Sequence, residues 1–259
     1  MSDTGSAAGI QLGAHSILPA RREPLSFRTD DGIDLVGELS LPSRRAPQAT
    51  LVMLHPLPTE GGSSDSHLYR KAAWRLPALA DLAILRFNTR GTTSSLGRSA
   101  GQFDKGWSER FDLAAAVSHA KALGLPRLWL VGWSFGSEVA LMHGANLPVE
   151  GAVLLSPPLK RAGPADLVQW AACRLPLVAL VPEHDQFLGP AQARDRFRLA
   201  SQVRVVVGPG FGHLWIGEKA VHWALSELTK AVGVRAEPLP KSWSGPVSQY
   251  HPQAGKVTP

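Results

Sequence analysis

The chain has 259 residues, of which 44% are hydrophobic and 19% are charged, as is typical of a folded globular protein. A chain of this length buries a sizeable core, and a single α/β domain of this size is common. Its one cysteine, Cys173, excludes an internal disulfide framework and is typical of a reducing compartment. Residues 1–24 lack the apolar block of a secretion signal, and no run of 18 apolar residues is present. We therefore expect a cytoplasmic protein with no membrane partner.

The formal net charge of +6 and the pI near 9.8 raise the question of nucleic-acid binding. However, the basic residues occur as scattered pairs, such as Arg21-Arg22 and Arg44-Arg45, and never form a tract. This pattern is typical of a solvated surface rather than a phosphate-binding face. The sequence thus predicts no nucleic-acid partner.

Both ends of the chain differ in composition from its middle. Residues 1–22 and 236–259 lack hydrophobic periodicity, and the second stretch is rich in proline, serine and lysine. We expect a flexible N-terminal arm and a flexible C-terminal tail on either side of one domain, residues 23–235. No internal repeat divides that domain.

The domain begins with a predicted β-hairpin, because two strand-like runs flank the turn residues Asp30-Asp31-Gly32. Apolar runs and helical patterns then alternate. A strand that is apolar throughout is buried on both faces, as in a parallel sheet covered by helices. The predicted strands are 50–54, 83–87, 128–131, 152–155, 177–181 and 203–207, and the predicted helices are 66–80, 108–123, 136–146, 190–200 and 217–232. This order predicts a three-layer α/β fold whose site lies at the carboxyl ends of the strands.

The segment Gly132-Trp133-Ser134-Phe135-Gly136 lies between a predicted strand and a predicted helix. A sharp strand-to-helix turn crowds the backbone, so small residues are needed at positions 132 and 136. Such a turn presents the Ser134 hydroxyl to solvent beside the positive end of the next helix. G-x-S-x-G in this context is typical of a nucleophile elbow, and Ser134 is therefore the predicted nucleophile.

A serine hydroxyl needs a positioned general base, and His213 follows the last predicted strand through a glycine-rich loop. The imidazole in turn needs a carboxylate, which Asp185 offers just beyond the strand 177–181. Glu183, two residues earlier, is an alternative to Asp185. All these residues follow predicted strands, where we expect the site.

Charge develops on the substrate oxygen during attack, and backbone N–H groups commonly stabilise it. The Phe135 amide, next after the nucleophile, is one predicted donor. Within Pro56-Leu57-Pro58 only Leu57 has an N–H, so its amide is the predicted second donor; a plain proline-rich turn is the alternative. No paired His or Cys spacing accompanies these residues, and we expect no metal and no cofactor.

These motifs resemble those of the α/β-hydrolase family, from about Leu25 to Lys230. The order serine, aspartate, histidine is the order of that family. The segments His55-Pro-Leu-Pro and Arg86-Phe-Asn-Thr-Arg-Gly91 are most similar to small bacterial hydrolases near the dienelactone-hydrolase and acyl-peptidase branches. Dienelactone hydrolases use cysteine where this chain has serine, so that activity is not implied. The interval from Ser156 to Leu177 fits one helix and predicts a minimal or absent cap.

The resemblance implies a serine-dependent, carboxylesterase-like hydrolase that cleaves a small-molecule carboxylic ester through an acyl-enzyme on Ser134. A thioester or amide substrate remains open. Trp133, Phe187 and Trp215 are expected to line the substrate cleft. Two alternatives stand beside this function: an acyltransferase or perhydrolase with the same triad, and a non-catalytic binding module. The sequence determines neither the substrate nor the oligomeric state.

Overall fold

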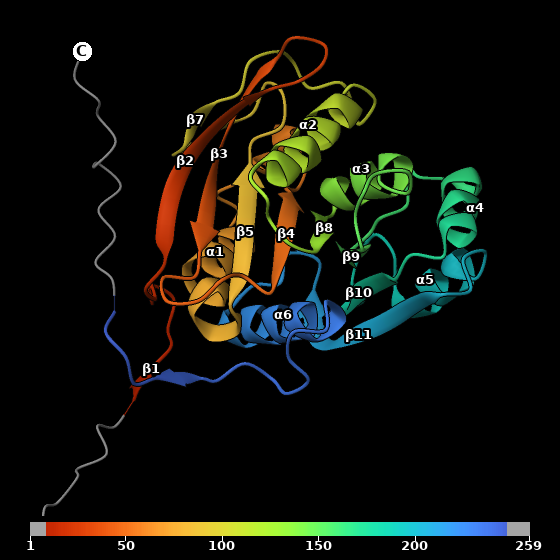
Figure 1. Ribbon diagram of the computed structural model, residues 1–259. Helices are drawn as coiled ribbons and strands as arrows, with labels where there is room; N and C mark the ends of the chain where they lie inside the picture. The colour runs from red at the N-terminus through yellow and green to blue at the C-terminus, as the bar shows by residue number, and fades with distance from the viewer. Residues whose placement is uncertain (1–8, 248–259) are drawn as a thin grey trace, which may run out of the picture.

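The computed structural model describes residues 9–247, which form one eight-stranded sheet with helices on both faces (Figure 1). The strand order is β11-β10-β9-β8-β4-β5-β3-β2. Their bounds are β2 Arg21–Arg28, β3 Asp34–Leu41, β4 Ala49–Leu54, β5 Leu82–Phe87, β8 Leu128–Trp133, β9 Gly151–Leu155, β10 Leu177–His184 and β11 Val203–Gly212. Within this sheet, the β2–β3 and β3–β5 pairs are antiparallel, and the other pairs are parallel.

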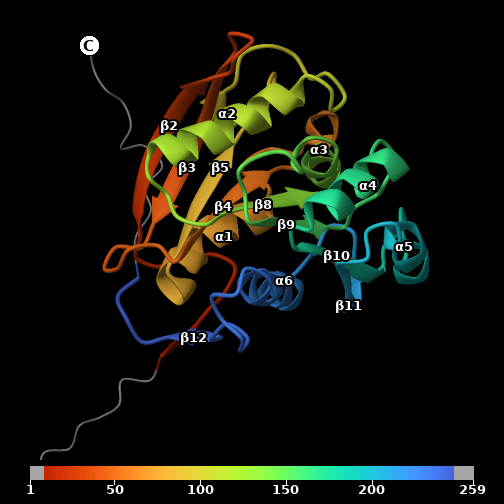
Figure 2. The same cartoon turned by 45° about the vertical axis from the view of Figure 1, so that its right-hand side comes forward.

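The helices divide between the two faces of the sheet, as Figures 1 and 2 show from two directions. Those on one face are α1 His67–Ala80 and α6 Glu218–Ala231; those on the other are α2 Glu109–Ala122, α3 Phe135–His143, α4 Pro164–Cys173 and α5 Pro190–Phe197. Alternate residues of each central strand feed one core or the other: Val52 and Leu54 face α2 and α3, whereas Leu51 and Met53 face α1. This double burial explains why the central strands are predominantly apolar. The predicted three-layer fold is confirmed.

The predicted hairpin is also confirmed. Its turn is closed by the Thr29 N–H, which donates to Ile33 O at 2.9 Å, and Gly32 adopts a φ of 85°. Between β9 and β10 the chain forms only α4, so the site carries no helical lid. Shorter elements are η1 Pro58–Glu60, β6 Thr93–Ser94 and β7 Gly97–Arg98.

The segments before and after the sheet differ from the flexible arms that their composition predicts. β1 Ile10–Gln11 pairs antiparallel with β12 Ser242–Trp243. Leu18 is fully buried and its N–H donates to Trp74 O, while Leu239 donates to Ser226 Oγ. Single buried leucines of this kind hold a segment against the domain. Because they do not recur at helical or strand spacing, the hydrophobic pattern of the sequence does not reveal them. Residues 1–8 and 248–259 of the expected arms lie outside the described residues.

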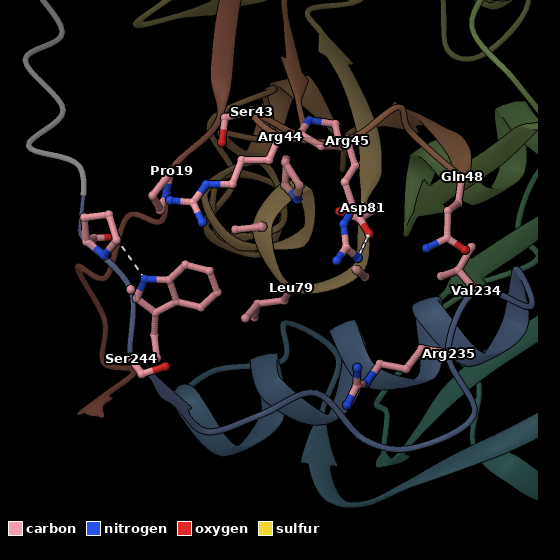
Figure 3. A pocket seen from close by; sticks show the side chains of 17 residues that line it. Pro19, Ser43, Arg44, Arg45, Gln48, Leu79, Asp81, Val234, Arg235 and Ser244 are labelled. Carbon is pink, nitrogen blue, oxygen red and sulfur yellow. Dashed lines mark hydrogen bonds and ion pairs between the residues drawn. The ribbon is translucent and has the colours of Figure 1, made fainter. Parts of the chain in front are cut away.

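The docked C-terminal segment also walls a cavity of about 540 Å³ at the amino edge of the parallel strands (Figure 3). Arg44, Arg45 and Arg235 line this cavity, and Arg45 pairs with Asp81 at 3.3 Å. The carboxyl ends of the strands lie at the opposite edge of the sheet. Among residues 9–247, no helix is long and apolar enough to cross a lipid bilayer.

Candidate active site

The turn between β8 and α3 places Ser134 in a strained backbone conformation, with φ 51° and ψ −115°. A non-glycine residue pays for such a conformation in free energy and keeps it only when the surroundings enforce it. Here the Ser134 N–H donates to Leu155 O at 2.8 Å, and the Ser137 N–H donates to Ser134 O at 2.9 Å. These contacts hold the half-buried Ser134 side chain at the carboxyl edge of the sheet.

The two glycines of the elbow leave no room for a side chain. A Cβ at Gly136 would lie 1.9 Å from Leu54 O, and one at Gly132 would lie 2.4 Å from Gly136 O. Both distances are far below any real contact, and both neighbours are backbone atoms that cannot rotate away. The spacing of G-x-S-x-G is therefore imposed by the close approach of α3 to β4 and β8.

Ser134, His213 and Asp185 come together from three separate loops. His213 Nε2 lies 2.9 Å from Ser134 Oγ, and His213 Nδ1 lies 2.8 Å from Asp185 Oδ2. The side chains of His213 and Asp185 are only 3% and 2% exposed, so water does not compete for this pair. An ionised carboxylate only accepts hydrogen bonds; Nδ1 must therefore carry the proton, which leaves Nε2 free to accept from the serine.

The carboxylate of Asp185 is itself held by the backbone. Its Oδ1 accepts N–H groups of Phe187 at 2.8 Å and Leu188 at 3.3 Å. The alternative carboxylate, Glu183, is exposed and accepts the Gly210 N–H at 2.7 Å instead. The structure thus places Asp185 beside the imidazole and Glu183 away from it.

The backbone of His213 is fixed by two donors from other elements. Trp133 Nε1 and Ser156 Oγ donate to His213 O at 3.3 and 2.9 Å. Two residues on, Trp215 O lies 3.2 Å from His67 Nε2. Burial lowers the pKa of His67, which favours the neutral ring with one N–H to donate. Sequence reasoning missed Ser156 and His67, because nothing in their local pattern sets them apart.

The expectation that Trp133 and Trp215 line the substrate cleft is corrected by their burial. Trp133 is 2% exposed and packs edge-on against Tyr69, while Trp215 is fully buried and stacks on Trp223. Both belong to the core beneath α1 and α6 and are out of reach of a substrate from solvent. Phe187 is 43% exposed and contacts the His213 imidazole edge-on, with ring centres 4.5 Å apart. Of the three aromatic residues, only Phe187 lies at the site surface.

The two predicted oxyanion donors have no competing acceptor. Among residues 9–247, the Leu57 N–H donates to no other group, while its carbonyl accepts the Gly62 N–H at 3.0 Å. The Phe135 N–H belongs to the first turn of α3, where backbone donors lack partners within the helix. Both amides are therefore available to a bound oxygen.

His55, which sequence reasoning names only as part of the His-Pro-Leu-Pro segment, holds the loop that carries Leu57 in place. Its Nδ1 lies 2.7 Å from Pro56 O, and its Nε2 accepts the Thr89 N–H at 3.1 Å. Complete burial lowers the pKa of His55 to about 4, so the ring is neutral at pH 7, with Nδ1–H as donor and Nε2 as acceptor. One imidazole thereby links the oxyanion loop to the loop after β5.

Residues 9–247 contain no cluster of three or more His, Cys, Asp or Glu side chains placed to hold a metal ion. The polar groups at the carboxyl edge are instead those of a nucleophile, a base, a carboxylate and two amides. This set can attack a carbonyl carbon and stabilise the resulting oxyanion.

The chain is similar in sequence and in fold to members of one known protein family. The model of the alpha/beta hydrolase family matches residues 51–251. No curated protein matches the chain significantly. An α/β serine hydrolase without a lid from Xanthomonas campestris is 28% identical, with a TM-score of 0.65 over 83% of this chain and 94% of that one.

Two further solved structures share the fold. A serine hydrolase homologue from Coxiella burnetii is 23% identical, with a TM-score of 0.63 over 81% of this chain and 95% of that one. An esterase from Pyrococcus furiosus is 15% identical, with a TM-score of 0.68 over 87% of this chain and 98% of that one. At these identities the likeness concerns the fold alone.

Proposed function

The chain belongs to the alpha/beta hydrolase family, and on that premise we propose that it is a serine hydrolase that cleaves a carboxylic ester through an acyl-enzyme on Ser134. The observation that supports this most is the continuous chain of hydrogen bonds from Asp185 through His213 to Ser134. A protein that only binds a partner needs neither this series of hydrogen bonds nor a serine in a strained backbone conformation.

In the first half of the reaction, Ser134 Oγ attacks the ester carbonyl while His213 Nε2 takes the hydroxyl proton. The imidazolium that forms keeps its Nδ1–H on Asp185, whose negative charge stabilises it. Collapse of the tetrahedral intermediate breaks the bond to the alcohol oxygen, which receives the proton from Nε2. The acyl group remains on Ser134.

The oxyanion is stabilised by the N–H groups of Leu57 and Phe135. Because both donors are fixed before substrate arrives, they cost no reorganisation during the reaction. Loss of one such donor lowers the rate on the order of 10²–10³-fold. His55 acts through Leu57, because it sets the position of the loop that carries the amide.

In the second half, water enters through the open edge and attacks the acyl carbon while His213 takes its proton. The bond to Ser134 Oγ then breaks, Oγ receives the proton from His213, and the acyl group leaves as an acid. The absence of a helical lid between β9 and β10 leaves this edge accessible to solvent. Water as acceptor distinguishes the hydrolase from the acyltransferase and perhydrolase alternatives.

The test combines a fluorophosphonate probe with turnover of p-nitrophenyl acetate. Wild type is expected to be labelled and to hydrolyse the ester. Ser134→Ala is expected to lose both, and His213→Ala is expected to lose turnover on the order of 10⁴–10⁶-fold. Undiminished activity in Ser134→Ala would remove this serine from the mechanism. Labelling together with turnover that requires added alcohol would instead identify an acyltransferase.

A further inference from the structure

A groove of about 610 Å³ adjoins the triad and is lined by the loops after β9 and β10 and by α5. Phe187 belongs both to this groove and to the surroundings of His213, whose imidazole its ring touches. Pro158, Leu159 and Leu188 supply apolar walls. The groove therefore lies one aromatic side chain away from the catalytic imidazole.

The charges on the groove do not cancel. Asp195 pairs with Arg198 at 3.3 Å, whereas Lys160 and Arg196 form no ion pair within residues 9–247. Arg196 donates to Leu159 O at 3.0 Å, and the Lys160 ammonium lies 4.2 Å from the centre of the Phe187 ring. Two cations without a carboxylate partner within residues 9–247 thus line a groove that shares the Phe187 side chain with the surroundings of the catalytic imidazole.

The loop that carries Lys160 is fixed rather than free. Glu138, one turn into the helix after the nucleophile and fully buried, accepts the N–H groups of Lys160 and Arg161. Its second carboxylate oxygen accepts Arg161 Nη1 at 3.1 Å. This anchoring neutralises Arg161 and fixes the backbone of Lys160, whose ammonium lies over the Phe187 ring and has no carboxylate partner within residues 9–247.

The position of the groove indicates which part of an ester it holds. His213 gives its proton to the departing oxygen, so the alcohol part lies on the imidazole side of Ser134. The oxyanion amides of Leu57 and Phe135 hold the carbonyl oxygen. Because Phe187 contacts the imidazole and also lines the groove, the groove lies on the same side of Ser134 as the alcohol part.

We propose that the groove binds the leaving group of the ester and that this leaving group carries a negative charge, which Lys160 recognises with support from Arg196. The proposal rests on the proposed function and specifies its substrate class: esters whose alcohol part bears an anionic group. The reaction itself is unchanged. Ser134 Oγ bonds to the acyl carbon, the bond to the leaving oxygen breaks, and the anionic alcohol departs with the proton from His213.

The test compares two phenyl acetates that differ in charge, 4-carboxyphenyl acetate and 4-carbamoylphenyl acetate. The quantity measured is kcat/KM for the carboxyphenyl ester divided by kcat/KM for the carbamoylphenyl ester. The two esters differ in intrinsic reactivity, but this difference is the same for every variant and cancels when the ratios of two variants are compared. Lys160→Met keeps the apolar stem and is expected to lower the ratio about two- to five-fold, the range for an exposed charge pair. Lys160→Glu is expected to lower it further, and Lys160→Arg to restore it.

Two controls accompany these variants. Lys121→Met removes an exposed lysine at the far end of α2 and is expected to leave the ratio unchanged. Added salt, about 0.5 M, is expected to reduce the wild-type preference, because screening weakens exposed charge pairs.

A ratio that is the same in wild type, Lys160→Met and Lys160→Glu would overturn the proposal while leaving the esterase intact. A Lys160-dependent preference for a succinate monoester, with the charge on the acyl part, would overturn the assignment of the groove to the leaving group. Failure of wild type to hydrolyse either acetate, with no labelling of Ser134, would instead refute the proposed function and this inference with it.

Discussion

Replacement of Asp185 by asparagine tests the logic of the triad with almost no change in shape. In the structure, Oδ1 of Asp185 accepts two backbone N–H groups, and Oδ2 faces the Nδ1 of His213. The asparagine must keep its carbonyl oxygen toward the two N–H donors, because its NH₂ cannot accept them. The NH₂ group then faces His213 and forces Nδ1 to be the acceptor.

The consequence is a reversal of the imidazole tautomer. With Nδ1 deprotonated, the proton of the neutral ring moves to Nε2, which then points an N–H at Ser134 Oγ and cannot take its proton. The expected loss is on the order of 10⁴-fold in kcat for p-nitrophenyl acetate. KM is expected to change little, because Asp185 does not face the substrate.

The matched control is Glu183→Gln, two residues away, whose side chain contacts Gly210 rather than the imidazole. This variant is expected to retain activity within about three-fold, since surface substitutions of this kind have small effects. The tautomer argument would be refuted if kcat fell by less than ten-fold in Asp185→Asn, or if it fell by more than ten-fold in Glu183→Gln.

Three further outcomes follow from the packing around the site. Gly136→Ala places a Cβ 1.9 Å from a carbonyl oxygen of β4 and is expected to destabilise the fold by about 3 kcal/mol or more in urea unfolding, whereas Gly189→Ala, in open space, is expected to be neutral. Equal stabilities would contradict the steric argument. Trp133→Phe removes a donor to His213 O and is expected to lower kcat about ten-fold with little change in KM; unchanged kcat would mean that the loop is held by other contacts. The pKa of His55 is about 4 in the folded protein, below its ordinary value of 6.5. Between these two pH values the imidazole binds more protons in the unfolded chain than in the folded one, so the free energy of unfolding falls as pH falls, by up to about 3 kcal/mol. Unfolding free energies between pH 7 and pH 4 are expected to fall less steeply in His55→Gln, and identical slopes would refute this role.

The sequence predicts the fold of this protein well because the buried strands appear in it as short apolar segments. Strands such as β4 and β9 are buried at every position, and short, almost wholly apolar segments of this kind are typical of a parallel sheet covered on both faces. The turn that carries Ser134 is equally predictable from the sequence, because only glycine fits at positions 132 and 136. The fold class and the nucleophile turn follow from these features, the hairpin from its Asp-Asp-Gly turn, and the missing cap from the short interval between Ser156 and Leu177.

The surroundings of the site are less legible. A tryptophan beside a predicted nucleophile is compatible with a cleft wall and with a core, and only the position of α1 places Trp133 in the core. His55, Glu138 and Ser156 act through partners far along the chain, which no local pattern reveals. β11 likewise extends to Gly212, because it pairs with His184 beyond an irregularity in β10, although its glycines and proline predict a loop.

The central claim is a covalent intermediate on one serine, and it is tested most directly by mass spectrometry of enzyme quenched during turnover of p-nitrophenyl acetate. An acetyl group is expected on the peptide that contains Ser134. Turnover of the ester with no acetylated peptide, or with the acetyl group on another residue, would contradict the account.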